Sequence, residues 1–230
     1  MKVLVTAGST EVPIDRVRVI SNIFGGITGT RIAKYFASRG DQVTLLTSNP
    51  DLAKREIRSK SVTVRRFRTF DSLAERLEQQ IRTGGYDVII HSAAVSDFRI
   101  AGIRAVIDGQ PVELDPAAAL KIPSGAKGLA LMLAPTPKLI DQIRQPWGFT
   151  GVLVKFKLEV GMTERDLLAK ARRSMNDSRA DAIVANCLEW SGSRALIGMA
   201  DELNFVEVSR SKLPLVLRQT IRIIQKRGGA

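Results

Sequence analysis

Residues 22–30 read Asn-Ile-Phe-Gly-Gly-Ile-Thr-Gly-Thr, a glycine-rich stretch between a strand-like run at residues 2–6 and a helical pattern at residues 28–38. Three glycines within five positions remove the Cβ atoms that would keep a ligand away from the backbone. The free N–H groups and the dipole of the following helix favour an anion. We therefore expect a phosphate or a carboxylate at this helix N-terminus. A purely structural glycine-rich turn is the alternative.

The rest of the chain alternates short apolar runs with helical patterns. The strands that we expect lie at residues 42–47, 61–66, 86–90, 129–133, 151–156 and 181–185, with two weaker ones near 195–199 and 205–208. Helices are expected at 71–82 with Asp71 or Ser72 as the cap, at 136–144 with Thr136 as the cap, from Thr163 onward, and at 211–226. This alternation predicts an α/β, Rossmann-like, doubly wound fold, with a mostly parallel sheet and helices on both faces.

The remaining segments are expected to be irregular. Residues 10–22 form a long connector with Pro13 and Asp15, which favour a loop or turn. Asn49-Pro50 is expected to close the strand at 42–47. Residues 99–127 are rich in proline and glycine and predict a small protruding arm or hairpin. We expect residues 1–230 to form a single domain that carries this arm.

Composition narrows the classes of function. One cysteine and one histidine among 230 residues exclude an internal disulfide framework and multi-histidine metal sites. No apolar run approaches the roughly 18 to 20 residues that span a membrane, and the N-terminus lacks a signal-peptide pattern. A cytoplasmic protein is therefore expected.

The formal net charge of +12 suggests a nucleic-acid surface, a pocket for polyanionic small molecules, or a solvated basic surface. The basic residues are scattered and no aromatic platform is interleaved with them. We do not expect nucleic-acid binding to be the main function.

Known nucleotide and hydrolase motifs are incomplete or absent. The sequence has no Gly-Lys-Ser/Thr, no full G-x-G-x-x-G after the first strand, and no Gly-x-Ser-x-Gly elbow.

Small residues and Asp97 instead follow the strand at 86–90, at the sheet edge where open α/β folds bind ligands. His91 is expected to be a satisfied core histidine, and Asp97 could also be a turn former. Lys121 is of functional interest only if the arm closes over the phosphate site.

Six segments together resemble the phosphopantothenoylcysteine synthetases. Their order and spacing agree along nearly the whole chain, which makes the resemblance specific although each segment alone is weak. No flavin-binding decarboxylase domain precedes them, so the chain looks like a stand-alone synthetase. The segments are residues 5–22, Ala-Ala-Val-Ser-Asp-Phe (93–98), Leu-Lys-Ile-Pro-Ser (120–124), Pro-Thr-Pro-Lys-Leu-Ile (135–140), Lys-Phe-Lys-Leu-Glu (155–159) and Ile-Val-Ala-Asn (183–186).

The resemblance implies a homodimeric, cytoplasmic ligase of coenzyme A biosynthesis. Members of the family use a nucleoside triphosphate with Mg²⁺, CTP in most bacterial forms and ATP in eukaryotic ones. They activate the carboxylate of 4′-phosphopantothenate as an acyl-nucleotidylate and release pyrophosphate. The amine of cysteine then forms the amide. The partner chain supplies part of each phosphopantothenate site. No protein ligand for the metal is predicted.

The resemblance also assigns roles to residues. Catalytic roles fall to Asn22, Lys121 and Asp97: Asn22 would orient the acyl-nucleotidylate and its oxyanion, and Lys121 would neutralise phosphate charge during nucleotidyl transfer. Arg18 would reach the pantothenate phosphate, across the dimer interface. The residues implied for the nucleotide and the adjoining substrate region are Gly8, Gly26, Gly29, Ala93, Ala94, Phe156 and Asn186.

Two alternatives remain beside the ligase. The family usually has serine or threonine where this chain has Phe24 and Gly25, and many bacterial members have a lysine cluster where it has Lys121 alone. The loop hydroxyls are missing but the backbone cradle remains, so a retuned or non-catalytic homologue is one alternative. The other is an NAD(P)-dependent Rossmann-type reductase, because Val-Leu-Val-Thr-Ala-Gly (3–8) also begins such enzymes. No Tyr-x-x-x-Lys pair supports that reading.

Overall fold

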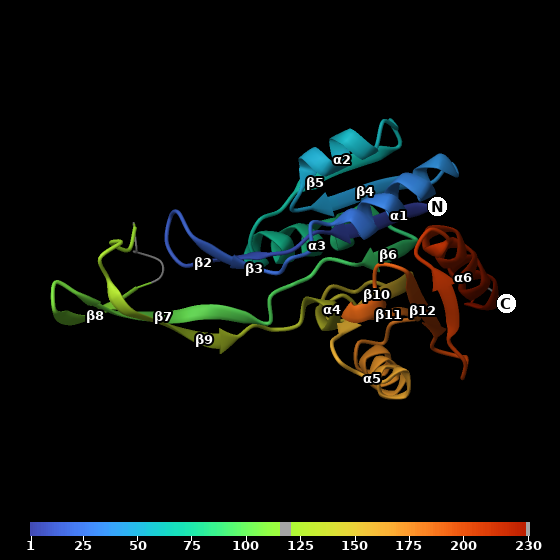
Figure 1. Ribbon diagram of the computed structural model, residues 1–230. Helices are drawn as coiled ribbons and strands as arrows, with labels where there is room; N and C mark the ends of the chain where they lie inside the picture. The colour runs from blue at the N-terminus through green and yellow to red at the C-terminus, as the bar shows by residue number, and fades with distance from the viewer. Residues whose placement is uncertain (116–120, 229–230) are drawn as a thin grey trace.

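A computed structural model describes residues 1–115 and 121–228, which form an α/β body with a long antiparallel arm projecting from one side (Figure 1). The body contains an eight-stranded sheet with the order β13-β12-β11-β10-β6-β1-β4-β5. Its strands are β1 (Lys2–Ala7), β4 (Gln42–Thr47), β5 (Val62–Arg66), β6 (Val88–His91), β10 (Val152–Glu159), β11 (Ala182–Cys187), β12 (Arg194–Met199) and β13 (Val206–Ser209).

The sheet is parallel from β5 to β11, and only β12 and β13 at one edge run antiparallel. Strand β1 lies in the middle, with Val5 opposite Leu45 on one side and Ile90 on the other. Parallel strands must be joined by crossovers, and here helices supply most of them. The expected doubly wound, mostly parallel fold is confirmed, and β5 lies at the other edge of the sheet.

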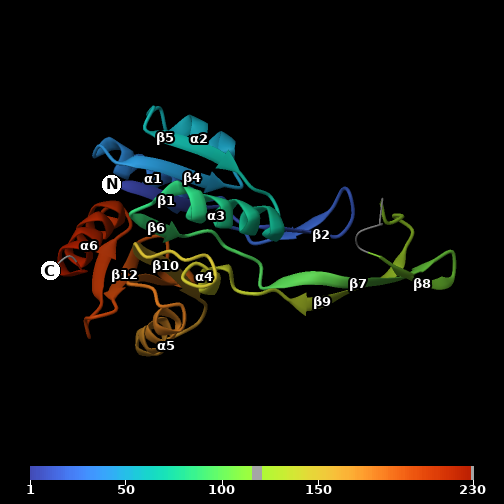
Figure 2. The same cartoon turned by 180° about the vertical axis from the view of Figure 1, so that it is seen from behind.

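Helices cover both faces of this sheet (Figures 1 and 2). Helices α1, α2 and α6 pack on one face, and α3, α4 and α5 pack on the other. Their bounds are α1 (Ile27–Ser38), α2 (Pro50–Glu56), α3 (Phe70–Gly84), α4 (Leu139–Gln142), α5 (Glu164–Asp177) and α6 (Leu213–Gly228), and a 3-10 turn spans Leu188–Trp190.

The two faces of β1 contribute to separate cores, and this explains its unbroken apolar sequence. Val3 and Val5 pack with Phe36 of α1, whereas Leu4 points to the opposite face and packs with Leu77 of α3. All five side chains are fully buried. Burying an aliphatic or aromatic side chain of this size contributes about 1.5–3 kcal/mol, so the strand that carries the site is anchored from both sides.

Two segments outside the central sheet form antiparallel strands, and one of them is the expected arm. Residues 10–22 contain a hairpin of β2 (Glu11–Pro13) and β3 (Val19–Ser21), so the prediction of a simple loop was wrong. The arm is a three-stranded antiparallel sheet of β7 (Phe98–Ile107), β8 (Gln110–Leu114) and β9 (Lys127–Pro135). The strand expected at 129–133 belongs to this arm and not to the central sheet. Residues 116–120, including Leu120 of one resembling segment, lie outside the described residues.

Helix boundaries were predicted less well where capping decides them. Thr136 does not cap a helix, because its hydroxyl donates to the carbonyl of Ser96 and α4 begins only at Leu139. Asn49 does cap one: its Oδ1 accepts from the N–H of Leu52 and starts α2, which was not predicted. Thr163 caps α5 as expected, by accepting from the N–H of Asp166. Each such cap contributes about 1 kcal/mol.

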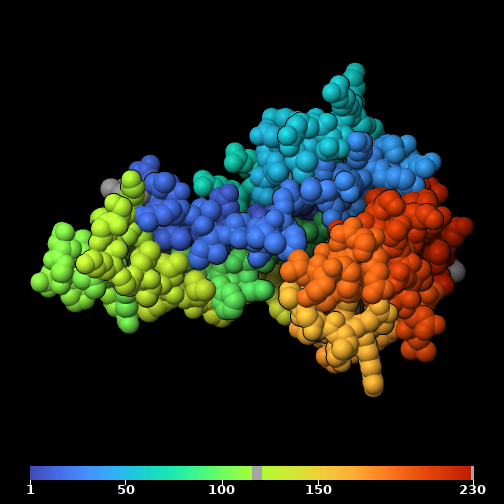
Figure 3. Space-filling model, viewed as in Figure 1, coloured from blue at the N-terminus to red at the C-terminus, as the bar shows by residue number. Residues whose placement is uncertain are grey.

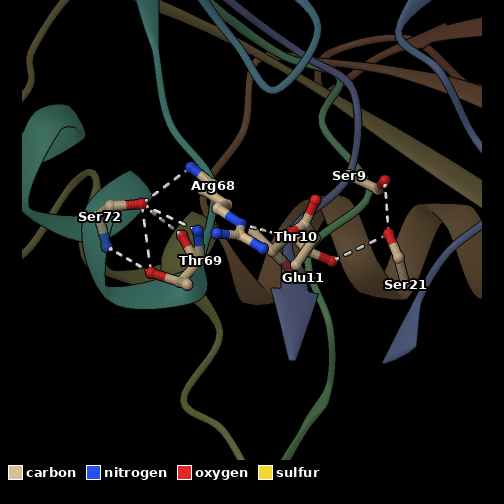
Figure 4. A network of polar contacts seen from close by, with 7 residues as sticks. All are labelled: Ser9, Thr10, Glu11, Ser21, Arg68, Thr69 and Ser72. Atoms are coloured by element: carbon tan, nitrogen blue, oxygen red, sulfur yellow. Dashed lines mark hydrogen bonds and ion pairs between the residues drawn. The ribbon is translucent and has the colours of Figure 1, made fainter. Parts of the chain in front are cut away.

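The N-terminus of α3 joins the base of the β2–β3 hairpin through a polar network (Figure 4). Thr69, rather than Asp71 or Ser72, is the cap of α3, and it forms a reciprocal capping box with Ser72. Arg68 pairs with Glu11 of β2, whose N–H donates to the carbonyl of Arg68 at 2.9 Å. The exposed ion pair contributes little by itself, but the backbone bond holds β2 against the start of α3.

Ser21 completes this network from the other hairpin strand. Its Oγ lies 3.0 Å from Ser9 Oγ, two residues after β1, and 3.3 Å from the carbonyl of Thr10 (Figure 4). The hairpin is therefore fastened to the end of β1 on one side and to α3 on the other. Because Asn22 is the next residue, this network also determines where Asn22 lies.

The tip of the hairpin is tied to the arm. Figure 3 shows the hairpin lying along the arm, and hydrogen bonds explain this contact. Asp15 accepts from the N–H of Ile122 at 3.0 Å, and Arg18 pairs with Asp15 and donates to the carbonyl of Ile122 at 2.5 Å. These donors, the N–H of Ile122 first, hold the pKa of Asp15 well below its usual range. Arg18 and the segment that follows Lys121 are thus joined.

Candidate functional site

A cavity of about 680 Å³ opens at the carboxyl ends of the central strands, where open α/β sheets bind ligands. Its wall is formed by the glycine-rich loop and first turn of α1, the segment after β6, the approach to α4, the ends of β10 and β11, and the start of α6. The topology therefore brings together parts of the chain that are far apart in the sequence.

The glycine-rich loop allows α1 to begin against the end of β1. Gly26 has a φ of +86°, and a Cβ there would lie 2.7 Å from the amide nitrogen of Gly8. A Cβ on Gly29 would lie 2.7 Å from both the Cβ of Ala7 and the Oγ of Ser92. Side chains at either position would push the helix away from the strand.

No side chain of α1 itself neutralises the positive end of this helix. Gly26 is its N-cap, no side chain caps it, and its first turn contains no acidic residue. The N–H groups of this turn and the positive end of the helix dipole therefore remain available for an external anion.

The segment after β6 forms the part of the wall that adjoins the loop. The N–H of Ala94 donates to the carbonyl of Gly8 at 2.8 Å, which holds Ala93 and Ala94 close to β1. Asn22 Nδ2 donates to the carbonyl of Ala94 at 3.4 Å. A carboxamide nitrogen carries two hydrogens, so the second remains available for a ligand. Asp97 is exposed at the end of this segment.

The ends of β10 and β11 complete the cavity. Phe156 and Asn186 both line it, and Asn186 is 5 % exposed. Asn186 Oδ1 accepts from Arg210 at 3.3 Å. Lys155, also in the wall, donates to the carbonyl of Ser174 at 2.7 Å and to Ser178 Oγ at 2.9 Å. Burial lowers the pKa of Lys155 to about 8.

The charge of the wall is strongly positive. Among the described residues it contains one carboxylate, that of Asp97, and the cationic side chains of Arg31, Lys138, Lys155, Lys157 and Arg210. Lys157 pairs with Glu159 at 3.0 Å, but the other four have no ion pair among the described residues. A cavity with this balance attracts a ligand of several negative charges.

His91 is a buried, hydrogen-bonded histidine, as the sequence suggested, and it also lines the cavity. Thr6 Oγ1 accepts from the N–H groups of Ser92 and Ala93, so its own hydrogen points to Nδ1 of His91, 3.0 Å away. Nδ1 is then an acceptor and the ring is neutral. Burial, assisted by the charge of Lys155, lowers the pKa of His91 to about 4.

This pKa predicts a pH dependence of stability. Between about pH 4 and 6.5 the unfolded chain binds more protons at His91 than the folded one, so the free energy of unfolding rises with pH across this window. The contribution is about 3 kcal/mol. Urea unfolding from pH 4 to 7 measures it, and His91→Gln should flatten the rise. An equally steep rise in the variant would contradict the assignment.

The structure brings most of the predicted site residues together. Arg18 and Lys121 are absent from the lining of the cavity, and Arg18 is bound to the Asp15–Ile122 contact instead. The predicted residues that do line the cavity are Gly8, Asn22, Gly26, Gly29, Ala93, Ala94, Asp97, Phe156 and Asn186.

Sequence reasoning assigned no role to several polar residues of the wall, among them Lys155, Thr28, Arg31 and Arg210. Lys155 could have been found, because it is a lone cation in the apolar run at residues 152–156. Thr28 lies in the glycine-rich stretch but was given no role, whereas Arg31 and Arg210 carried no signal. Arg210 is 182 residues from Thr28, to which it is hydrogen-bonded, and no spacing in the sequence indicates such a contact.

Two structural features are not found in the described residues: a cluster of metal ligands and a membrane-spanning helix. Within residues 1–115 and 121–228 there is no group of three or more His, Cys, Asp or Glu side chains placed to hold a metal ion. Over the same ranges no helix combines the length and apolar character that crossing a bilayer requires.

Comparisons with known proteins agree with this architecture. Residues 1–220 match the family described as the DNA/pantothenate metabolism flavoprotein C-terminal domain. The coenzyme A biosynthesis bifunctional protein CoaBC of Thermococcus kodakarensis is 34% identical over 98% of this chain and 49% of its own length. The chain thus spans about half the length of that curated relative.

Solved structures share the fold. The crystal structure of a DNA/pantothenate metabolism flavoprotein from Streptococcus pneumoniae has a TM-score of 0.80 and 27% identity, over 97% of this chain and 99% of the other. The Cab2 mutant H337A in complex with phosphopantothenate-cysteine has a TM-score of 0.71 and 17% identity, over 98% of this chain and 88% of the other. With nearly its whole length matched, this chain belongs to the DNA/pantothenate metabolism flavoprotein C-terminal domain family.

Proposed function

We propose that this protein joins 4′-phosphopantothenate to cysteine through an acyl-nucleotidylate, at the expense of a nucleoside triphosphate. One observation carries the proposal: the open N-terminus of α1, Asn22 and Asp97 line the same strongly cationic cavity. Membership of the family supports it, as do a relative named for coenzyme A biosynthesis and a structural neighbour solved with phosphopantothenate-cysteine.

The first step brings two polyanions together. A carboxylate oxygen of phosphopantothenate attacks the α-phosphorus of the triphosphate, and the bond to pyrophosphate breaks. The N–H groups of the loop and of the first turn of α1 would hold the phosphates, with Gly26 and Gly29 allowing close approach. Holding both reactants in one cavity removes most of the entropic cost of their encounter.

The second step forms the amide. The amine of cysteine attacks the acyl carbon, the bond to the nucleoside monophosphate breaks, and the amine loses a proton. Asn22 would donate its second Nδ2 hydrogen to the oxygen that gains charge. The substrate supplies the nucleophile, so the protein needs none of its own. Asp97, a carboxylate in the wall, is placed to interact with the cationic amine or with a metal ion.

Phe156 and Asn186 would hold the nucleoside, CTP or ATP, next to the backbone of Gly8. The family expectation of Mg²⁺ fits this donor set: Mg²⁺ is commonly held by one or two carboxylates together with substrate phosphates, and the wall offers Asp97. When bound, the ion would neutralise charge on the triphosphate.

We further propose that residues 1–230 act as one domain and that two copies form a homodimer through the arm. Arg18 and Lys121 do not line the cavity of their own chain, so they would serve the cavity of the second copy. The arm also exposes apolar side chains, among them Phe98 and Leu133, each 50% exposed, which a partner would cover. A monomeric species in sedimentation velocity at micromolar concentration would contradict this.

The two alternatives have less support. The relatives reported above carry names from pantothenate and coenzyme A metabolism and none is named as a reductase. A retuned or non-catalytic homologue would keep the backbone cradle of Gly8 and Gly26 and the cationic wall. Only activity distinguishes it from the ligase.

Pyrophosphate release tests the proposal. The protein is incubated with CTP, ATP, GTP or UTP and Mg²⁺, with and without phosphopantothenate and with and without cysteine. Release should require both phosphopantothenate and one of the triphosphates, and added cysteine should give the amide, detected by mass spectrometry. No release with any triphosphate would refute the ligase. Protection against thermal unfolding by NADPH but not by CTP or ATP would favour a reductase.

A further inference from the structure

Arg210 is an unexpected part of the cavity wall. It lies between β13 and α6, and its N–H donates to the carbonyl of Ser193 at 2.8 Å. Its side chain nevertheless crosses to α1, where Nη2 donates to Thr28 Oγ1 at 2.6 Å. Nη1 donates to Asn186 Oδ1, at the end of β11. The guanidinium is thus fixed at the junction of α1, β11 and α6, at the end of the cavity where α1 begins.

The charge of this guanidinium has no counter-ion in the described part of the chain. Both side-chain partners of Arg210 are neutral, and neither Arg210 nor its neighbour Arg31 takes part in an ion pair there. Burial and the charge of Arg31 lower the pKa of Arg210. Placing two cations together in a partly buried site is unfavourable unless an anion joins them.

The loop beside Arg210 has no cationic side chain of its own with which to bind a phosphate. Residues 23–26 carry neither a hydroxyl nor a cation, so the loop can offer a phosphate only backbone N–H groups. A guanidinium has five N–H donors in a planar fork that matches phosphate oxygens. The contacts to Thr28 and Asn186 use two of the five and leave three for a ligand.

We propose that Arg210 binds the phosphate chain of the nucleoside triphosphate and provides, from outside the loop, the charged contact that the loop itself lacks. The proposal rests on the proposed ligase function, whose triphosphate it places. Thr28 and Asn186 act as positioning residues, which hold the guanidinium before the ligand arrives. Phosphopantothenate is not expected to contact Arg210.

Arg210→Met removes the charge and keeps most of the side-chain stem. Arg210→Lys keeps the charge but loses the fork. Arg222→Met is the matched control, because Arg222 is exposed on α6 and does not line the cavity. Calorimetric titrations with inorganic tripolyphosphate and with the triphosphate that supports pyrophosphate release measure the affinity for phosphates. The KM values for triphosphate and for phosphopantothenate are measured in parallel.

Arg210→Met should weaken both tripolyphosphate and the nucleoside triphosphate at least about tenfold, and Arg210→Lys should lie between it and wild type. The KM for phosphopantothenate and all values for Arg222→Met should remain within about twofold of wild type. Unchanged tripolyphosphate binding in Arg210→Met would overturn the proposal. If that variant does not fold, equal losses for tripolyphosphate and phosphopantothenate in Arg210→Lys would overturn it.

The same titrations separate this proposal from the ligase function. Wild-type protein that binds tripolyphosphate through Arg210 but releases no pyrophosphate would refute the ligase and leave the phosphate site standing. Pyrophosphate release that is insensitive to Arg210→Met would refute the phosphate site and leave the ligase standing. Wild-type protein that binds neither tripolyphosphate nor any nucleoside triphosphate would refute both.

Discussion

Asn22→Ala is expected to slow amide formation by about 100-fold or more, the usual effect of removing one oxyanion donor. Asn22 Nδ2 is directed over the cavity by its hydrogen bond to the carbonyl of Ala94, and the polar network at Ser21 fixes the backbone just before it. The loss should appear in kcat, because the donor acts on charge that develops during the reaction. Single-turnover formation of the amide, followed by mass spectrometry, measures it.

Two further variants make this result specific. Asn22→Asp keeps the shape but has no N–H, so it should be impaired as strongly as Asn22→Ala. Asn204→Ala changes an exposed asparagine away from the cavity and should behave like wild type. Amide formation by Asn22→Ala at the wild-type rate would contradict the role given to Asn22.

Gly26→Ala is expected to abolish most of the affinity for triphosphate. The new Cβ would lie 2.7 Å from the amide nitrogen of Gly8, and the residue would have to keep a φ of +86°. The loop must therefore move away from β1, and the N–H groups of the first turn of α1 move with it. We expect a Kd for triphosphate at least about tenfold higher and a loss of about 2–4 kcal/mol of stability.

Gly40→Ala is the matched control for this substitution. Gly40 lies just beyond the other end of α1, with a φ of +82°, but a Cβ there meets nothing within 4 Å. It should cost only the backbone strain, about 1–2 kcal/mol, and leave the Kd unchanged. Equal Kd values for the Gly26→Ala variant and wild type, measured calorimetrically, would show that the close approach of loop and strand does not matter for binding.

The central sheet could be predicted because its strands are buried on both faces. Val3, Leu4 and Val5 are consecutive apolar residues, as is typical of a strand buried on both faces. The buried first half of β10 begins with a similar apolar run. Helices with strong apolar periodicity, such as α1 and α5, were also placed correctly within a few residues. In each case local pattern and tertiary burial favour the same structure.

An arm near residues 99–127 was predicted, but its individual strands and the hairpin within residues 10–22 were not, because distant segments stabilise them. Strand β2 is held by a hydrogen bond to the backbone carbonyl of Arg68, and the tip of the hairpin is held by the backbone N–H of Ile122. Proline and glycine in residues 99–127 indicated an arm or hairpin without fixing its strands, and Pro111 lies in β8, an edge strand, where a missing N–H is tolerated. Local propensity does not contain this information.

The candidate site was predicted in part for a similar reason. Gly8, Gly26 and Asn22 lie in short motifs whose chemistry can be recognised along the chain. Arg210 becomes part of the site only through the return of α6 to α1. Arg18 carries an implied role that the single chain does not display, since its guanidinium is bound to Asp15 and Ile122.

A crystal of this protein soaked with the triphosphate tests the central claim most directly. The phosphate chain should lie at the N-terminus of α1, within hydrogen-bond distance of the backbone N–H groups of residues 26–29 and of Arg210, with the α-phosphorus facing Asn22. A triphosphate bound elsewhere, or phosphates directed away from Gly26 and Arg210, would contradict the account.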